Sequence, residues 1–336
     1  MPRNLAIDLG TANTLVYVRG RGIRLNQPTV IALDEKTGQI LAMGDEAHAM
    51  IGRTPANIIA VRPLRGGAIS DFDTAARLMQ MLLRRVGVGR LSARPKVVVC
   101  VPSAITEVER RAVQEAAVQA GAKAAFLIEE PMAAAIGAGL PVHEPAGNLV
   151  VDVGGGTTEV ACISLGGIVV SRAIRVGGFD LDAAVQQHIR REYALAIGER
   201  TAEEIKISIG SAAPQEVEAK HEVRGREIAT GLPKTVMLTG DELREALDDA
   251  VGQIVDAVVE TLSSSPPELA NDLLTTGIVL TGGSSQLRGL DLRIARETSI
   301  PVRLTPTPLE CVVLGAGTVV ESLDELAPLL TPIGGR

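Results

Sequence analysis

Two short segments combine the residue types that bind phosphate groups. In each, small residues and hydroxyl side chains follow an apolar run that ends near an aspartate, Asp8 in one and Asp152 in the other. Glycine lets the backbone approach a ligand closely, and threonine hydroxyls add donors to the backbone N–H groups. One such segment is most simply a tight hairpin turn, but two copies with an aspartate at the same offset favour phosphate binding. The expected phosphate-binding residues are Gly10, Thr11, Ala12, Asn13, Gly154, Gly155, Gly156 and Thr157.

The two aspartates are candidates for holding a metal ion. A carboxylate at the end of an apolar strand is costly unless it is hydrogen-bonded or holds a cation. Facing a polyphosphate, Asp8 and Asp152 would hold hydrated Mg²⁺ through outer-sphere contacts, because Mg²⁺ keeps most of its waters. The alternative is that each carboxylate caps its own turn. We favour the Mg²⁺ role.

An acidic pair, Glu129 and Glu130, precedes Pro131 at the expected start of a helix. For a lone glutamate, interaction with the helix dipole would be a sufficient explanation. Neighbouring side chains on an extended segment point in opposite directions, so one of the two can face a cleft. A glutamate near a terminal phosphate can orient an attacking water.

Two further features suit a nucleoside, although neither specifies one alone. Glu203 and Lys206 stand three apart on one face of an expected helix, a spacing that by itself describes a surface ion pair. A glycine turn follows an apolar strand and would let an adenine ring lie flat on the backbone. Its residues are Gly282, Gly283, Ser284 and Ser285.

The elements that must position these residues form two α/β halves. The segments 5–18 and 149–163 repeat one pattern, an apolar strand, a small-residue turn and a second strand, so each half is expected to open with a hairpin. Alternating strands and helices then predict a mostly parallel sheet covered on both faces. We expect strands at 96–102, 126–129 and 277–283, and helices at 106–121, 131–136, 179–194, 201–209, 239–262 and 309–320.

Local signals support several of these boundaries. Thr106 with Glu109 and Thr239 with Glu242 are capping-box pairs that begin helices. The serine and proline run at 263–267 indicates a helix end and a loop. We expect halves at 1–139 and 140–336, with small insertions at about 20–70 and about 180–255. The first insertion has no evident counterpart at the same place in the second half.

Composition excludes several classes of protein. The 336 residues exceed the usual size of one hydrophobic core, and with 1% aromatics that core must consist of Val, Ile, Leu and Ala. The net charge is −7 and no run of Lys or Arg is present, so the sequence does not indicate a nucleic-acid-binding protein. No secretion signal is evident and no apolar run is long enough to span a bilayer. Isolated in apolar contexts, three cysteines are expected to be buried thiols: Cys100, Cys162 and Cys311.

Together these segments resemble the five motifs of the superfamily that contains actin, sugar kinases and heat-shock chaperones. They are two phosphate hairpins, an adenosine turn and two connecting helices, at 8–14, 152–158, 282–285, 129–139 and 309–317. Within that superfamily, the amino-acid sequences of segments 7–14, 128–137 and 197–203 are most similar to the MreB/Mbl family of bacterial actin homologues. This resemblance implies an actin-like ATPase fold, in which two duplicated RNase H-like α/β domains with small inserted subdomains enclose a nucleotide cleft.

The resemblance also implies roles for individual residues. Asp8 and Asp152 correspond to the Mg²⁺-side carboxylates. Glu130 corresponds to the residue that positions water, with Thr157 assisting, because it stands directly before the Pro-x-Ala-Ala-Ala segment. The nucleoside site comprises Glu203, Glu204, Ile205, Lys206, Gly282, Gly283, Ser284 and Ser285.

The family resemblance further implies an ATP-dependent filament of paired protofilaments. Such a filament would lie in the cytoplasm at the inner face of the cell membrane and act with cell-wall elongation proteins to maintain cell shape. Family members reach the membrane through an amphipathic N-terminal helix or an apolar loop, but residues 1–4 are too few for a helix and 89–94 offer one large apolar side chain. We therefore expect weak membrane contact that depends on filament avidity.

Two other functions fit parts of the same pattern. A small-metabolite kinase of this superfamily would need a catalytic aspartate and a second substrate pocket, and no motif for either is evident. A chaperone ATPase would need a peptide-binding domain after the nucleotide unit, which we do not expect here.

Overall fold

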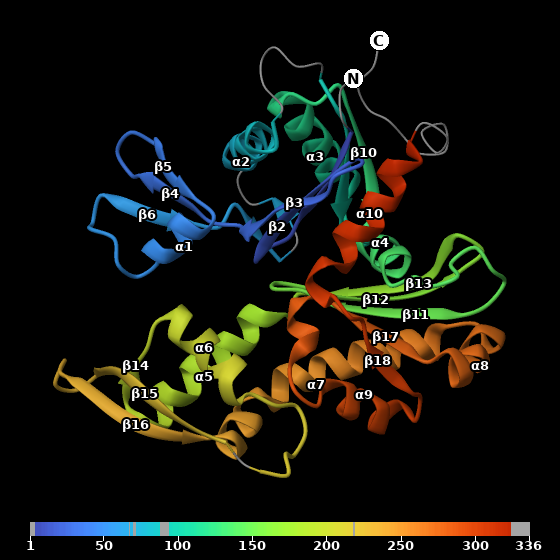
Figure 1. The fold of residues 1–336 in the computed structure, drawn as a ribbon. Helices are drawn as coiled ribbons and strands as arrows, with labels where there is room; N and C mark the ends of the chain where they lie inside the picture. The colour runs from blue at the N-terminus through green and yellow to red at the C-terminus, as the bar shows by residue number, and fades with distance from the viewer. Residues whose placement is uncertain (1–3, 67, 70–71, 88–93, 218, 324–336) are drawn as a thin grey trace.

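Two five-stranded sheets with the same strand order form the body of the protein (Figure 1). The computed structural model describes residues 4–66, 68–69, 72–87, 94–217 and 219–323. The first sheet, ordered β3-β2-β1-β9-β10, contains β1 (Leu5–Leu9), β2 (Asn13–Val18), β3 (Gly22–Pro28), β9 (Lys96–Val101) and β10 (Ala124–Glu129). The second, ordered β13-β12-β11-β17-β18, contains β11 (Asn148–Val153), β12 (Thr158–Ser164), β13 (Gly167–Ile174), β17 (Ile278–Thr281) and β18 (Val302–Leu304).

The internal repeat in the sequence corresponds to this duplication. In both sheets the first three strands pair as an antiparallel meander that begins with a hairpin. The fourth strand then pairs in parallel with the first, and the fifth pairs in parallel with the fourth. Every residue of β1 and β11 is buried, as expected of central strands covered on both faces. The two predicted phosphate turns therefore occupy equivalent positions in the two halves.

Helices cover the outer face of each sheet. In the first half these are α2 (Phe72–Arg85) and α3 (Glu107–Ala120). The second half contains α5 (Gly178–Tyr193), α6 (Glu199–Ile209), α7 (Gly240–Ser264), α8 (Pro267–Thr276) and α9 (Leu290–Thr298). Both predicted capping boxes are present, at the starts of α3 and α7. Of these helices, the sequence prediction missed α2, α8 and α9.

Two helices lie between the sheets, α4 (Glu130–Gly137) and α10 (Cys311–Glu321). Their apolar residues form one core cluster with residues from both sheets. The helix backbones approach very closely: a Cβ added to Gly315 would lie 1.8 Å from the Ala133 carbonyl oxygen, and one added to Gly137 would lie 1.9 Å from that of Cys311. Only glycine fits at these two positions.

Gly315→Ala is therefore expected to lower the free energy of unfolding by about 1–3 kcal/mol, since an overpacked contact forces the backbones apart. Gly252→Ala is the matched control, because Gly252 is inside α7 and an added Cβ meets no atom within 4 Å there. That change should raise stability by about 0.5–1 kcal/mol, because alanine favours the helix. Denaturant unfolding of the two variants measures both effects. Equal stability of the Gly315 variant and the parent would contradict the close packing of α4 and α10.

Each half also carries a small insert after its third strand. In the first half the insert contains β4 (Ile31–Asp34), β5 (Ile40–Met43), α1 (Asp45–Met50) and β6 (Ile58–Val61). In the second half a three-stranded sheet contains β14 (Leu195–Ala196), β15 (Lys220–Glu227) and β16 (Pro233–Thr239). The inserts thus begin at related places, which the sequence prediction did not anticipate. The expected range 20–70 also takes in β3, which belongs to the main sheet.

The remaining elements are short. A two-stranded ribbon of β7 (Leu64–Arg65) and β8 (Ala68–Ile69) follows the first insert, and two 3-10 turns, η1 (Gly283–Gln286) and η2 (Pro308–Glu310), border the second sheet. All three cysteines are buried and unbonded to one another, as predicted. Within the described ranges, no helix is both long and apolar enough to cross a membrane.

Candidate functional site

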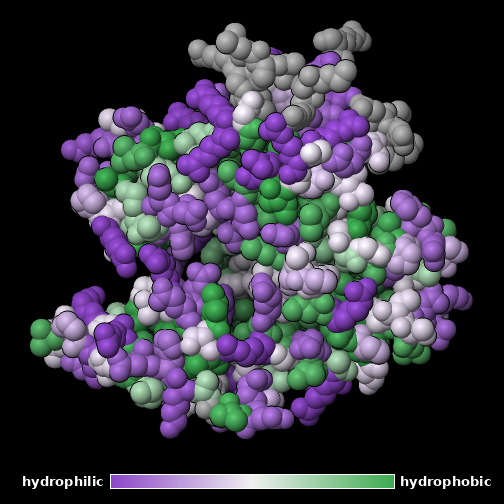
Figure 2. Space-filling view, viewed as in Figure 1, coloured by the Kyte–Doolittle hydropathy of each residue, from purple (hydrophilic) through white to green (hydrophobic). Residues whose placement is uncertain are grey.

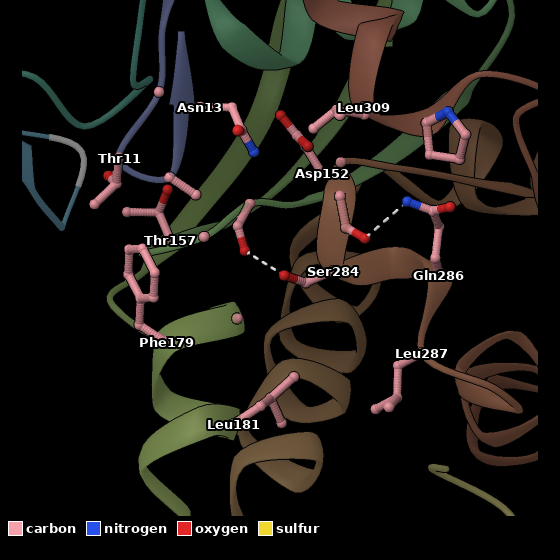
Figure 3. Close-up of a pocket in the computed structure, with 18 of the residues that line it drawn as sticks. Thr11, Asn13, Asp152, Thr157, Phe179, Leu181, Ser284, Gln286, Leu287 and Leu309 are labelled. Atoms are coloured by element: carbon pink, nitrogen blue, oxygen red, sulfur yellow. Dashed lines mark hydrogen bonds between the residues drawn. The ribbon is translucent and has the colours of Figure 1, made fainter. Parts of the chain in front are cut away.

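A cavity of about 500 Å³ lies between the two halves, a size typical of small-molecule sites. It is lined by both hairpin turns, the start of α4, the starts of α5 and η1, and one face of α6 (Figure 3). Most of the predicted site residues line it: Asp8, Gly10, Thr11, Ala12, Asn13, Glu130, Asp152, Gly154, Gly155, Thr157, Glu203, Lys206, Gly282, Gly283 and Ser284.

The two hairpin turns meet across the cleft. A Cβ added to Gly155 would lie 2.4 Å from the Ala12 Cβ, and one added to Gly156 would lie 2.9 Å from the Thr11 Cγ2. Neither glycine has a positive φ, so what requires glycine here is the close approach of the opposite turn. The turns of the two halves thus form a single cradle.

The carbonyl groups of the second turn are engaged by the second half itself. The Gly154 oxygen accepts hydrogen bonds from the Gly178 N–H at 3.0 Å and the Ser284 hydroxyl at 2.8 Å. The Phe179 N–H donates to the Gly155 oxygen at 2.8 Å. These hydrogen bonds hold the second turn in place against the starts of α5 and η1.

Carboxylates gather beside this cradle and perturb one another. Burial raises the pKa of Asp8 to about 7. Burial, reinforced by the charges of Asp8 and Glu159, raises that of Asp152 to about 8. Burial and the charge of Glu159 also hold the pKa of Glu130 well above its usual range. Ionising these carboxyl groups together is therefore costly unless a nearby cation offsets their charge, as a divalent cation would.

These carboxylates fit hydrated Mg²⁺ better than a closed metal site. Among the residues that the structure describes, no group of three or more His, Cys, Asp or Glu side chains has the geometry to enclose a metal ion. Mg²⁺ needs few protein ligands because it keeps waters and binds substrate phosphates. Asp8 and Asp152, one from each half, both line the cavity and are suitably placed for such indirect contacts.

The two neighbouring glutamates point in different directions. Glu130 lines the cavity, whereas the Glu129 carboxylate accepts a hydrogen bond from Arg110 on α3, with 3.0 Å between Oε1 and Nη2. The extended backbone of Glu129 separates the two side chains, as alternation predicts. Of this pair, Glu130 is the one that can act on a ligand in the cleft.

Lys206 lines the cavity but pairs with a different residue from the one its spacing suggested. Its Nζ is 2.8 Å from Asp182 Oδ1 and donates to the Gly178 carbonyl oxygen at 3.1 Å. Both side chains of the Lys206–Asp182 pair are nearly buried, with 12% and 8% exposed. Glu203 also lines the cavity, so the alternative of a surface ion pair with Lys206 is not the arrangement in the structure.

Four predicted residues do not line the cavity. Glu204 lies 4.0 Å from Arg200 on the outer face of α6, and Ile205 is fully buried in the core of the second half. Ser285, the last residue of the predicted adenosine turn, is buried, and its hydroxyl donates to the Gly282 carbonyl oxygen at 2.6 Å. Gly156 packs against Thr11. These residues can support the site but cannot present side chains to a ligand.

Gly282 holds the predicted adenosine turn against the end of β11 and the second hairpin turn. Its φ is 86°, and a Cβ added there would lie 2.3 Å from Asp152 Oδ1 and 2.4 Å from the Val153 carbonyl oxygen. A side chain at this position is therefore excluded both by backbone conformation and by space. The turn is held directly beside one of the two expected Mg²⁺ carboxylates.

Comparison with known proteins agrees with this geometry. The family model described as "MreB/Mbl protein" matches residues 2–328. The chain belongs to the MreB/Mbl family. It is 49% identical to the cell shape-determining protein MreB of Escherichia coli (strain K12), over 96% of this chain and 94% of the relative. It is 45% identical to the cell shape-determining protein Mbl of Bacillus subtilis (strain 168), over 96% and 97%.

Solved structures show the same fold. MreB5 of Spiroplasma citri bound to AMPPNP matches with a TM-score of 0.93 and 36% identity, covering 98% of this chain and 99% of that one. The same protein bound to ADP matches with a TM-score of 0.92 and 37% identity, covering 97% and 99%. The predicted actin-like ATPase fold, with duplicated α/β halves around a cleft, is confirmed for this MreB/Mbl family member.

The sequence did not identify three residues that shape this cleft. Phe179 and Asp182 line the cavity from α5. Glu159 on β12 is 1% exposed, and its carboxylate accepts hydrogen bonds from the Ser103 N–H of the first half at 3.0 and 3.3 Å. Of these three residues, only Glu159 could have been found from the sequence, because the repeat places it in an apolar strand and a buried charged residue requires a partner.

Proposed function

We propose that this chain binds ATP with Mg²⁺ in the cleft between its halves, hydrolyses it and assembles into filaments that determine cell shape. The observation that carries the proposal is the cradle of two facing turns with Asp8, Asp152 and Glu130 around one cavity. Family membership supports it, because the relatives are cell shape-determining proteins and MreB5 has been solved with AMPPNP and with ADP.

In this proposal the backbone N–H groups and hydroxyls of the two turns bind the phosphates. Asp8 and Asp152 would hold Mg²⁺, which when bound neutralises charge on the phosphate oxygens. Glu203, Lys206 and the turn at Gly282 bind the nucleoside, from α6 and η1. Each group is contributed by a separate element, so nucleotide binding joins the two halves.

Glu130 orients the attacking water, with the Thr157 hydroxyl assisting. Burial and the neighbouring carboxylates raise the pKa of Glu130, so its carboxylate, once ionised, is a stronger base toward that water than an ordinary glutamate. The neighbouring carboxylate Glu159 contributes to that shift and is held in place by Ser103. The water-orienting group is therefore supported from both halves of the molecule.

The proposed partners are further copies of the chain, in paired protofilaments, and cell-wall elongation proteins at the inner face of the membrane. Membrane contact is proposed to be weak for one molecule and stronger for a filament, because avidity adds many weak contacts. The two segments considered for membrane contact, 1–4 and 89–94, lie almost wholly outside the described residues.

Purified protein with ATP and Mg²⁺ is expected to form paired straight filaments, as seen by electron microscopy. Phosphate release per chain should rise with protein concentration, because assembly and hydrolysis are coupled. A small-metabolite kinase would instead stay monomeric and show ATP turnover that a small substrate stimulates. A monomer at all salt and protein concentrations would overturn the filament proposal.

A further inference from the structure

One cationic side chain bridges the mouth of the cleft. Arg62 directly follows β6 in the insert of the first half, and its guanidinium carbon lies 4.4 Å from the centroid of the Phe179 ring. Its Nη2 is also 3.5 Å from Glu199 Oε2. Phe179 and Glu199 stand in the first turns of α5 and α6, in the second half. Figure 2 shows the molecular surface hollowed where the two inserts face each other, with hydrophilic side chains on both rims.

The environment of Arg62 differs from that of an ordinary surface arginine. Its side chain is 18% exposed, while that of Glu199 is 57% exposed. A guanidinium over an aromatic face gains more when it is shielded from water, and its planar shape suits stacking better than an ammonium group does. The Phe179 contact is therefore expected to contribute more than the exposed ion pair with Glu199.

Phe179 connects this contact to the phosphate cradle. Its ring lines the cavity, and Figure 3 draws it on the same side as Thr11 and Thr157. Its backbone N–H donates to the Gly155 carbonyl oxygen at 2.8 Å. A movement of the first-half insert that carries Arg62 away would thus remove the cation–π contact from a residue that lines the cavity and touches the second hairpin turn.

We propose that Arg62 is a clamp that holds the cleft closed over bound nucleotide, and that nucleotide leaves only after Arg62 separates from Phe179 and Glu199. This inference rests on the proposed nucleotide site. It assigns the residue that controls release from that site, a positioning role in which Arg62 acts through Phe179 and not on the phosphates. Loss of the clamp should affect the dissociation rate more than the association rate, because the contacts form only once the cleft closes.

The first test is the dissociation of a fluorescent ADP analogue, chased with unlabelled ADP in the presence of Mg²⁺. Arg62→Ala should release the analogue between about five- and thirty-fold faster than the parent, with association changed less than about threefold. Arg62→Lys, which keeps the charge, should release it at an intermediate rate. The control is Arg53→Ala, an exposed arginine in the same insert, which should release at the parental rate.

A second test needs no nucleotide. Spin labels at Lys36→Cys and Thr235→Cys, both exposed positions on opposite inserts, report the width of the cleft, and the three native cysteines are buried. Arg62→Ala should shift the label distances toward longer values, and Arg53→Ala should not. If the parent binds ADP but Arg62→Ala changes neither the rate of ADP release nor the distance between the labels, the proposed role of Arg62 is wrong. If the parent binds no ADP while Arg62→Ala still widens the cleft, the nucleotide proposal fails and the closure contact stands.

Discussion

Glu130→Gln is expected to slow ATP hydrolysis by at least about tenfold while ATP binding and filament assembly persist. A neutral amide of the same shape leaves the phosphate cradle in place but holds and polarises the water less well. General-base contributions are typically about 10²- to 10⁴-fold, and a residue that mainly positions water lies at the lower end. The measurement is phosphate release at saturating ATP and fixed protein concentration, with nucleotide affinity determined separately.

Glu129→Gln is the matched control for this prediction. Glu129 is paired with Arg110 at 3.0 Å and does not line the cavity. Its substitution should change turnover by less than about threefold, within the range of a small change in interaction with the helix dipole. If the Glu129 variant is the slow one, or if both variants hydrolyse at the parental rate, the assignment of Glu130 is wrong.

The sequence predicted the positions of the two hairpins because it repeats itself. Asp8 and Asp152 occupy the same place in two copies of one strand pattern, and apolar runs with capping signals located most of the helices around them. The turn at Gly282 was predicted from its glycines, and the structure shows that Asp152 and Val153 leave no room for a side chain there. The repeat, the capping pairs and the glycine turn were therefore enough to predict the parts of the cleft that are formed within a single half.

Contacts between elements distant in sequence could not be predicted in this way. Lys206 appeared to pair with Glu203 on its own helix, but α5 brings Asp182 to 2.8 Å from its Nζ. Glu204 and Ile205 were predicted as site residues because they adjoin Glu203 in the sequence. Successive residues of a helix point in different directions, however, so Glu204 faces solvent and Ile205 faces the core. Proline at 267 indicated a loop, although it also suits the first turn of α8.

Gly155→Ala is expected to weaken ATP binding by at least about 100-fold, the second large effect. The added Cβ would lie 2.4 Å from the Ala12 Cβ, so the two turns must separate. Each charge-assisted hydrogen bond to a phosphate is worth about 1.5–3 kcal/mol, and a widened cradle loses more than one of them. Ala12→Gly alone should bind nearly as well as the parent. Combined with Gly155→Ala it should restore part of the affinity, because it removes the closest clashing atom.

We propose that ATP lies between these two turns. The most direct test is an equilibrium titration of ATP with Mg²⁺ against three proteins: the parent, Gly155→Ala, and the Gly155→Ala, Ala12→Gly double variant. We predict one ATP per parental chain, a large loss of affinity in the single variant and partial recovery in the double variant. Parental affinity in a correctly folded Gly155→Ala protein would contradict the claim, because the phosphates would then bind elsewhere.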